Sequence, residues 1–189
     1  MSLILFALVA VSTVWAHHTD NMYPTANLLS GCSPASICLQ DNSTFTYFRG
    51  SSLSANAKTN VFNVLTQKYD PTDLVVSEEN PPVYSGSAET DVIYRVNSGA
   101  VPPTAAAITV CDDVINSLRC DQFYISFRDN TIAINDAIAC HETGHSVGLT
   151  HGDVANPIKA NSDQSLECLA TPAPYVLSTH SVPQINANY

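Results

Sequence analysis

The stretch IACHETGHSVGLTHG constrains the fold more than any other part of this 189-residue chain, because it holds three of the six histidines at fixed spacings. His141 and His145 are four residues apart, so on an α-helix their side chains lie on one face, one turn apart. Gly148 can adopt a positive φ and end that helix sharply, and the chain can then bring His151 round to the other two. The spacing therefore predicts a helix at about 135–148 that ends in a tight turn.

The three imidazoles form a ligand set that suits zinc, which accepts neutral nitrogen donors and binds three protein ligands plus a water in catalytic sites. Glu142, next to the first histidine, can reach that water rather than the metal. The pattern H-E-x-x-H-x-x-G-x-x-H fixes five positions, and at average residue usage it should occur by chance in roughly one chain of this length in 10⁵. The sequence therefore predicts one catalytic Zn²⁺ bound by His141, His145 and His151, with Glu142 within reach of its water.

The same pattern resembles the zinc-binding consensus of the metzincin metallopeptidases. The resemblance implies that the three histidines are zinc ligands and that the chain is a secreted endopeptidase, in which zinc activates a water and Glu142 takes its proton as a peptide bond is hydrolysed. It also implies an α+β fold, with a twisted, mainly parallel sheet and two helices above a small irregular C-terminal subdomain. We expect a cleft between about residues 41–148 and 149–189, protein or peptide substrates as partners, and a monomer.

Two of the departures from the metzincin pattern lie at the turn expected beneath the zinc and directly after the third histidine. Members of the family carry a methionine in a tight turn beneath the zinc, whereas this chain has only Met1 and Met22. The resemblance places Leu169, in the run LECLATPAP, where that methionine stands. Because leucine has nearly the same volume and hydrophobicity, we expect some loss of rigidity rather than loss of the metal. Gly152, directly after the third histidine, matches none of the common subfamilies, so we assign no subfamily.

The missing methionine leaves a second hypothesis from a different class of function. In this alternative the chain is a metzincin-like binding protein in which zinc only stabilises the structure and no peptide bond is cleaved. Glu142 argues against it, because a structural zinc site has no need of a base. The chain also keeps both glycines of the histidine stretch, Gly144 and Gly148, which likewise argues against the non-cleaving alternative.

The N-terminus predicts a secretory signal peptide. Residues 3–16 are almost entirely apolar, which is too short a run to span a bilayer comfortably, and a small residue, Ala16, precedes the polar His17. We therefore expect a signal peptide at 1–16, and a single metallopeptidase domain at 17–189 that is secreted to the extracellular space without a stable membrane anchor. The alternative interpretation is a buried N-terminal strand.

Six cysteines in a chain with a signal peptide predict disulfides. The sequence permits fifteen pairings. Closeness along the chain favours Cys32–Cys38 and Cys111–Cys120 as small loops, which leaves Cys140–Cys168. That last bridge would tie the histidine helix to the region around Leu169.

The charge balance limits the partners. A formal net charge of −10 with only seven Lys and Arg residues argues against nucleic acid, because phosphate binding needs basic patches. Asp112 with Asp113, and Asp70 with Asp73, can contact Ca²⁺, but solvated loop acids are the default interpretation and nothing in the sequence supports a calcium site.

Hydrophobic periodicity supplies a coarse element order. A helix is expected at about 52–69, with Ser51 or Ser52 as its N-cap, and Asn135 or Asp136 is expected to cap the histidine helix. Runs rich in β-branched and aromatic residues predict strands at 43–50, 73–80, 90–97, 105–113 and 120–130. The order strand, helix, several strands, helix and irregular tail indicates a layered α/β or α+β fold.

Overall fold

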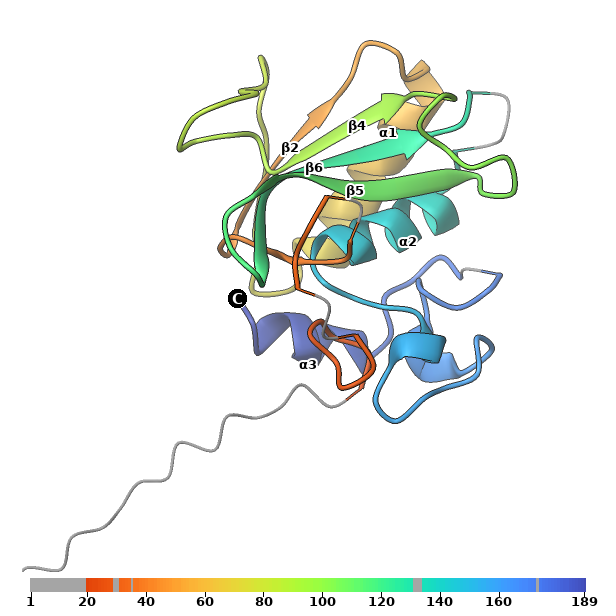
Figure 1. The fold of residues 1–189 in the computed structure, drawn as a ribbon. Coiled ribbons are helices and arrows are strands. Elements are labelled where there is room, and N and C mark those ends of the chain that lie inside the picture. Colours follow the sequence, from red (N-terminus) through yellow and green to blue (C-terminus); the bar gives the residue numbers. More distant parts are fainter. Residues whose placement is uncertain (1–19, 29–30, 35, 131–133, 173) are drawn as a thin grey trace, which may run out of the picture.

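The computed structural model describes residues 20–28, 31–34, 36–130, 134–172 and 174–189. These residues form a sheet with two helices packed on one face and a C-terminal part below the helices (Figure 1). The predicted signal peptide lies outside the described residues. Of the helices in the described ranges, none combines the length and apolar character needed to cross a membrane.

The sheet is mainly parallel, which confirms the α+β prediction. Its parallel strands run in the order β1-β6-β4-β2-β3, and β5 pairs with the other edge of β6 in the antiparallel sense. All five predicted strands are present, and the two-residue β1 is an addition that no sequence pattern indicated. The bounds are β1 (Leu39–Gln40), β2 (Thr44–Arg49), β3 (Val75–Glu78), β4 (Val92–Val96), β5 (Ala107–Val114) and β6 (Arg119–Phe127).

The first predicted helix is present and slightly shorter than expected. Helix α1 (Ala55–Val64) continues into a π-helix (Leu65–Tyr69). Its N-cap is Ser54, whose hydroxyl accepts a hydrogen bond from a backbone N–H in the first turn (3.2 Å). The prediction of Ser51 or Ser52 as the cap is wrong, because the chain still turns there and the Ser52 hydroxyl accepts a hydrogen bond from the backbone of β4 instead (2.9 Å).

Helix α2 (Asp136–Ser146) carries the histidine motif and packs against β5, β6 and α1 (Figure 1). Its N-cap is Asn135, one of the two predicted caps, whose side chain accepts a hydrogen bond from Ile138 N (3.0 Å). Gly148 has a φ of +93°, which confirms that the helix stops where the glycine permits a left-handed residue.

Buried hydroxyl groups fix α2 in the layer beneath the sheet. Tyr69 Oη donates to the backbone oxygen of Cys140 (2.6 Å), and Tyr94 Oη shares a hydrogen bond with Thr143 Oγ1 (2.8 Å). Both tyrosines are fully buried. A buried hydroxyl without a partner would be costly, so these bonds specify both the depth and the rotation of the helix.

The C-terminal part contains a helix that the sequence did not predict. Besides two short 3₁₀ turns (Gly152–Val154 and Gln164–Leu166), it includes α3 (Ser181–Asn186). The described structure therefore has three helices rather than the expected two. Six residues are too few to show an apolar stripe, and α3 is held instead by the fully buried side chain of Ile185.

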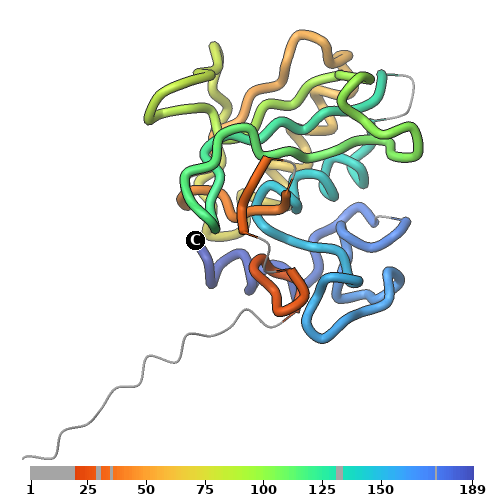
Figure 2. Tube along the Cα trace, viewed as in Figure 1, coloured from red at the N-terminus to blue at the C-terminus, as the bar shows by residue number. Residues whose placement is uncertain are grey.

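Residues 20–25 lie along the segment that leaves α2. Isolated bridges pair Asp20 with Asn156 and Met22 with Leu149. Figure 2 shows this N-terminal segment, in red and orange, beside the blue C-terminal part. The segment contains no run of β-prone residues, so its pairing partner could not be predicted from local sequence.

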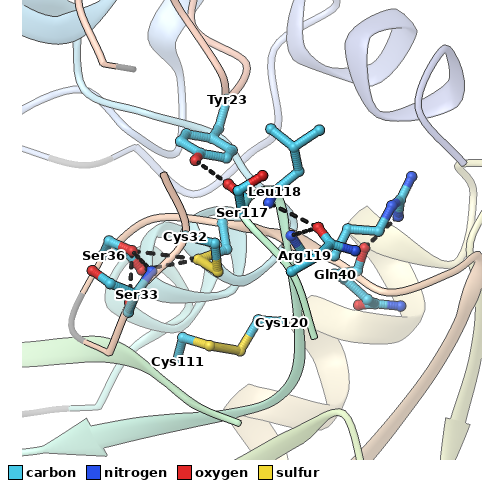
Figure 3. Close-up of a disulfide and its surroundings, with 12 residues drawn as sticks. Tyr23, Cys32, Ser33, Ser36, Gln40, Cys111, Ser117, Leu118, Arg119 and Cys120 are labelled. Carbon is cyan, nitrogen blue, oxygen red and sulfur yellow. Dashed lines mark hydrogen bonds between the residues drawn. A yellow bond between two sulfur atoms is a disulfide. The ribbon is translucent and has the colours of Figure 1, made fainter. Parts of the chain in front are cut away.

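The three predicted cysteine pairs all lie at disulfide distance. The Cα atoms are 5.3 Å apart in Cys32–Cys38, 5.9 Å in Cys111–Cys120 and 5.5 Å in Cys140–Cys168. The first two bridges lie near each other, next to the turn in which Ser117 accepts a hydrogen bond from Tyr23 Oη (3.1 Å, Figure 3). The third joins α2 to the C-terminal part.

Replacing both Cys140 and Cys168 with serine should lower the free energy of unfolding by about 3–4 kcal/mol, because the bridge closes a loop of 28 residues. Urea denaturation of the non-reduced protein measures this loss. The matched variant with Cys32 and Cys38 both changed to serine opens a loop of six and should lose only about 2 kcal/mol. A larger loss for the short loop would contradict this account.

Candidate metal centre

Helix α2 and the turn after it bring the three predicted histidines together. Nε2 of His141 lies 3.1 Å from Nε2 of His145 and 2.9 Å from Nε2 of His151. Nitrogens that share one ion at about 2.0–2.1 Å in tetrahedral geometry lie about 3.3–3.4 Å apart. The observed separations are close to this value, so the group can hold a metal ion.

Backbone carbonyls determine which nitrogen of two rings carries a proton. His141 Nδ1 lies 2.9 Å from the carbonyl oxygen of Cys168, and His145 Nδ1 lies 2.9 Å from that of Leu149. A carbonyl oxygen only accepts hydrogen bonds, so both Nδ1 atoms are donors and both Nε2 atoms of the neutral rings carry lone pairs. Two lone pairs that face each other at 3.1 Å repel unless a cation lies between them. Hydrogen bonds from Nδ1 to backbone carbonyls are the contacts that orient histidine ligands in metal sites.

The third histidine is placed by the turn at Gly152. A Cβ atom on Gly152 would lie 2.5 Å from the backbone oxygen of Lys159 and 2.7 Å from a methyl group of Leu166. No side chain fits there, so the local packing requires glycine at position 152. Lys159 N donates a hydrogen bond to the Gly152 backbone oxygen (2.9 Å), which closes the turn after His151.

Burial keeps all three imidazoles neutral. Burial lowers the pKa of His141 to about 4 and, more strongly, lowers that of His145, with a further contribution from the neighbouring rings. Burial also lowers the pKa of His151. The neutral ring is the form that binds a metal, so the site is prepared for a cation at pH 7.

Glu142 lies beside these ligands with its carboxyl group buried. The residue is 7% exposed, and burial raises the pKa of its carboxyl group to about 7, while a hydrogen bond from Thr109 opposes this shift. Thr109 Oγ1 lies 2.8 Å from Glu142 Oε2 and 2.9 Å from the Glu142 backbone oxygen. Sequence reasoning missed Thr109, since 33 residues separate the two positions and only the packing of β5 against α2 joins them.

The histidines and Glu142 open into one cleft of about 580 Å³. One wall is formed by residues 104–109, which belong to β5 and the segment before it, and the floor is formed by α2. The remaining lining residues are Ile37, His151, Ala170 and Thr171. The walls are mostly apolar and small, which leaves room for a ligand beside the histidine group.

Leu169 packs directly beneath the histidine helix. It is almost fully buried, and a Cβ atom on Gly144 would lie 2.8 Å from Leu169 Cδ2. A side chain at position 144 would displace this methyl group, so glycine allows α2 to rest on Leu169 in its present position. The preceding residue, Cys168, supplies the carbonyl that orients His141. Cys168 and Leu169, which are adjacent in one turn, therefore both contact the histidine helix.

Other polar candidates do not join this centre. His180 contacts the Asp20 carboxylate, which also pairs with Lys159. Of the acids considered for calcium, Asp113 lies within a carboxylate group with Glu89 and Asp121. Such acidic groups are common without an ion, so calcium gains no support.

The lowered histidine pKa values predict metal binding that resists mild acid. If all three rings titrated at their ordinary pKa, proton competition would weaken Zn²⁺ binding about 50-fold between pH 7.5 and pH 6.0. Because burial moves these pKa values downward, protons compete only at lower pH, and we expect a change of less than about threefold. Competition with a chelating dye at both pH values measures the dissociation constant. A loss near 50-fold would show that the rings are not buried as described.

Truncating Leu169 should loosen the support of the centre. Leu169→Ala removes buried methyl groups next to Gly144 and should lower the free energy of unfolding by about 2–5 kcal/mol. Leu169→Met nearly conserves volume and should cost less than about 1.5 kcal/mol. Urea denaturation of both variants gives the comparison. Equal losses in the two variants would refute the proposed packing role.

Comparisons with known proteins assign no family to this chain. No protein-family model matches the sequence, and a search of curated proteins finds none that is significantly similar to it.

Proposed function

We propose that the protein is a zinc-dependent endopeptidase of the metzincin type. The observation that carries this proposal is the convergence of three imidazole Nε2 atoms in a cleft that also receives the buried carboxyl group of Glu142. A purely structural metal site has no use for a buried acid beside its ligands. A hydrolytic site needs a base there, within reach of an attacking water.

Zinc is the ion that best fits the donor set. The ligands are three neutral imidazoles, without thiolates, in an arrangement that leaves the cleft side open to a further ligand. A bound zinc ion would supply a Lewis acid that polarises a substrate carbonyl and lowers the pKa of a water. The protein's own contribution is to hold the three rings neutral and correctly oriented.

Glu142 would move the proton during hydrolysis. In its ionised form the carboxylate accepts a proton from the water that attacks the peptide carbonyl, and it then returns the proton to the nitrogen of the leaving amine. A carboxyl group whose pKa is raised to about 7 is suited to both steps near neutral pH, because the free-energy difference between its two forms is small.

The edge of β5 is the surface on which a peptide would lie. Among the described residues, β5 pairs only with β6, and residues 104–109 form a wall of the cleft. An extended peptide can add to such an edge through backbone hydrogen bonds, with little dependence on its side chains. This placement brings a substrate backbone alongside Glu142 and the histidines, and favours a protein or peptide substrate.

The cysteines support an extracellular setting. All six belong to pairs at disulfide distance, and such bridges persist in oxidising compartments. Together with the apolar N-terminal run, they support a protein that is secreted after removal of residues 1–16. We propose that it acts there as a monomer.

The second candidate function is a binding protein that retains the metal without cutting. Leucine at position 169, where metzincins carry methionine, is the observation that favours it. The packing of Leu169 on Gly144 weighs against it, because the turn still supports α2 and still orients His141 through the Cys168 carbonyl. The endopeptidase is therefore the preferred function.

Glu142→Ala should retain one zinc ion per chain and lose peptide hydrolysis, by about 10³-fold or more, because the metal ligands remain and the proton acceptor is gone. Zinc content is measured by elemental analysis, and cleavage is measured with casein and a library of internally quenched peptides. The chelator-treated parent protein is the control for metal dependence.

Two results would count against the proposal in different ways. A Glu142→Ala variant that cuts as fast as the parent would remove the general-base role. A parent protein with stoichiometric zinc that cleaves neither casein nor any peptide in the library would favour the non-cleaving binding protein.

A further inference from the structure

Thr109 is the only side chain among the described residues that hydrogen-bonds the Glu142 carboxyl group. It lies on β5, opposite Ile125 of β6, and its hydroxyl reaches Glu142 Oε2 (2.8 Å) and the Glu142 backbone oxygen (2.9 Å). The two contacts join the edge strand to α2 at the residue between the helix's metal-site histidines. Thr109 also lines the cleft.

The contact leaves the two carboxyl oxygens in different surroundings. Oε2 faces the Thr109 hydroxyl, whereas Oε1 has no hydrogen-bond partner among the described residues. A glutamate has three side-chain torsions, so a buried carboxyl group with no fixed partner can adopt several orientations. One bond from a rigid strand selects an orientation in which the second oxygen remains free in the cleft.

We propose that Thr109 is a positioning residue that holds the Glu142 carboxyl group so that its free oxygen Oε1 faces the attacking water. This inference rests on the proposed function, since it assigns Thr109 an effect that acts through the general base. Thr109 itself touches neither the water nor the substrate carbonyl in this role. Its hydroxyl holds Oε2, and its own position is set by the pairing of β5 with β6.

A purely structural role is the competing explanation. The bond from Thr109 to the Glu142 backbone oxygen ties β5 to α2 and would stabilise the fold even in a protein without activity. The two explanations differ in what they change. Loss of a structural tie lowers stability or metal content, whereas loss of a positioning bond lowers kcat in a protein that is folded and loaded with metal.

Thr109→Val is the direct test, because valine has nearly the same shape and lacks the hydroxyl. In the zinc-loaded protein, kcat should fall about 10- to 100-fold, the range seen when partners around a metal site are removed. KM should stay within about threefold and zinc content should be unchanged. Thr109→Ser keeps the hydroxyl and should restore kcat to within about threefold of the parent.

Two further variants serve as controls for a folding defect. Thr109→Ala removes the hydroxyl without placing a methyl group against Glu142, and it should show the same loss of kcat. Thr59→Val is the matched control, since Thr59 lies exposed on α1 and its hydroxyl donates to the Ala55 carbonyl of the same helix (3.0 Å). Its kcat should equal that of the parent.

Crystal structures of the zinc-loaded variants give a readout that does not depend on activity. Glu142 should occupy one rotamer in the parent and in Thr109→Ser, and more than one in Thr109→Val. A single unchanged rotamer in Thr109→Val, or an unchanged kcat in that variant while Glu142→Ala is inactive, would overturn the positioning role and leave the proposed function intact. An active Glu142→Ala variant would instead contradict the proposed function itself.

Discussion

Two hydrogen bonds from imidazole rings to backbone carbonyls determine what the centre can bind. They place protons on Nδ1 of His141 and His145 and leave the lone pairs of both Nε2 atoms facing one point. Each carbonyl is held by a different part of the chain. The Cys168 carbonyl lies in a turn bridged to α2, and the Leu149 carbonyl lies in a segment paired with Met22. The ligand geometry therefore depends on segments from both ends of the sequence.

The layered fold gives the three histidines and Glu142 different supports. The histidines are oriented from below, by the C-terminal part and the N-terminal segment, while Glu142 is contacted from above by β5. Helix α2 lies between these supports, and two buried tyrosine hydroxyls fix its rotation. Because neighbouring residues of one helix point in different directions, adjacent positions in the motif can carry out separate tasks.

Much of this centre could be predicted from the sequence, because its chemistry is encoded within eleven consecutive residues. Helical spacing places His141 above His145, and Gly148 is the residue type that permits the turn. Five of the six strands were also predictable, since each has its own β-prone run, whereas the mainly parallel arrangement was expected only from the metzincin resemblance. The three cysteine pairs followed from closeness along the chain and from elimination, and all three lie at disulfide distance.

The parts that could not be predicted depend on contacts between distant segments. No local pattern joins Thr109 to Glu142, because the pair is created by the packing of an edge strand on a helix. The same holds for Met22 beside Leu149. Helix α3 is too short to show periodicity, and its position depends on one buried side chain, Ile185. Such contacts carry no signature until the tertiary structure is known.

The central claim is that three imidazoles bind one zinc ion through Nε2 and leave a position open to the cleft. X-ray absorption spectroscopy of the protein loaded with one equivalent of Zn²⁺ tests this most directly. The account predicts three histidine nitrogens at about 2.0–2.1 Å and one further light ligand. A spectrum with sulfur in the first shell, or with fewer than three imidazoles around the ion, would contradict it.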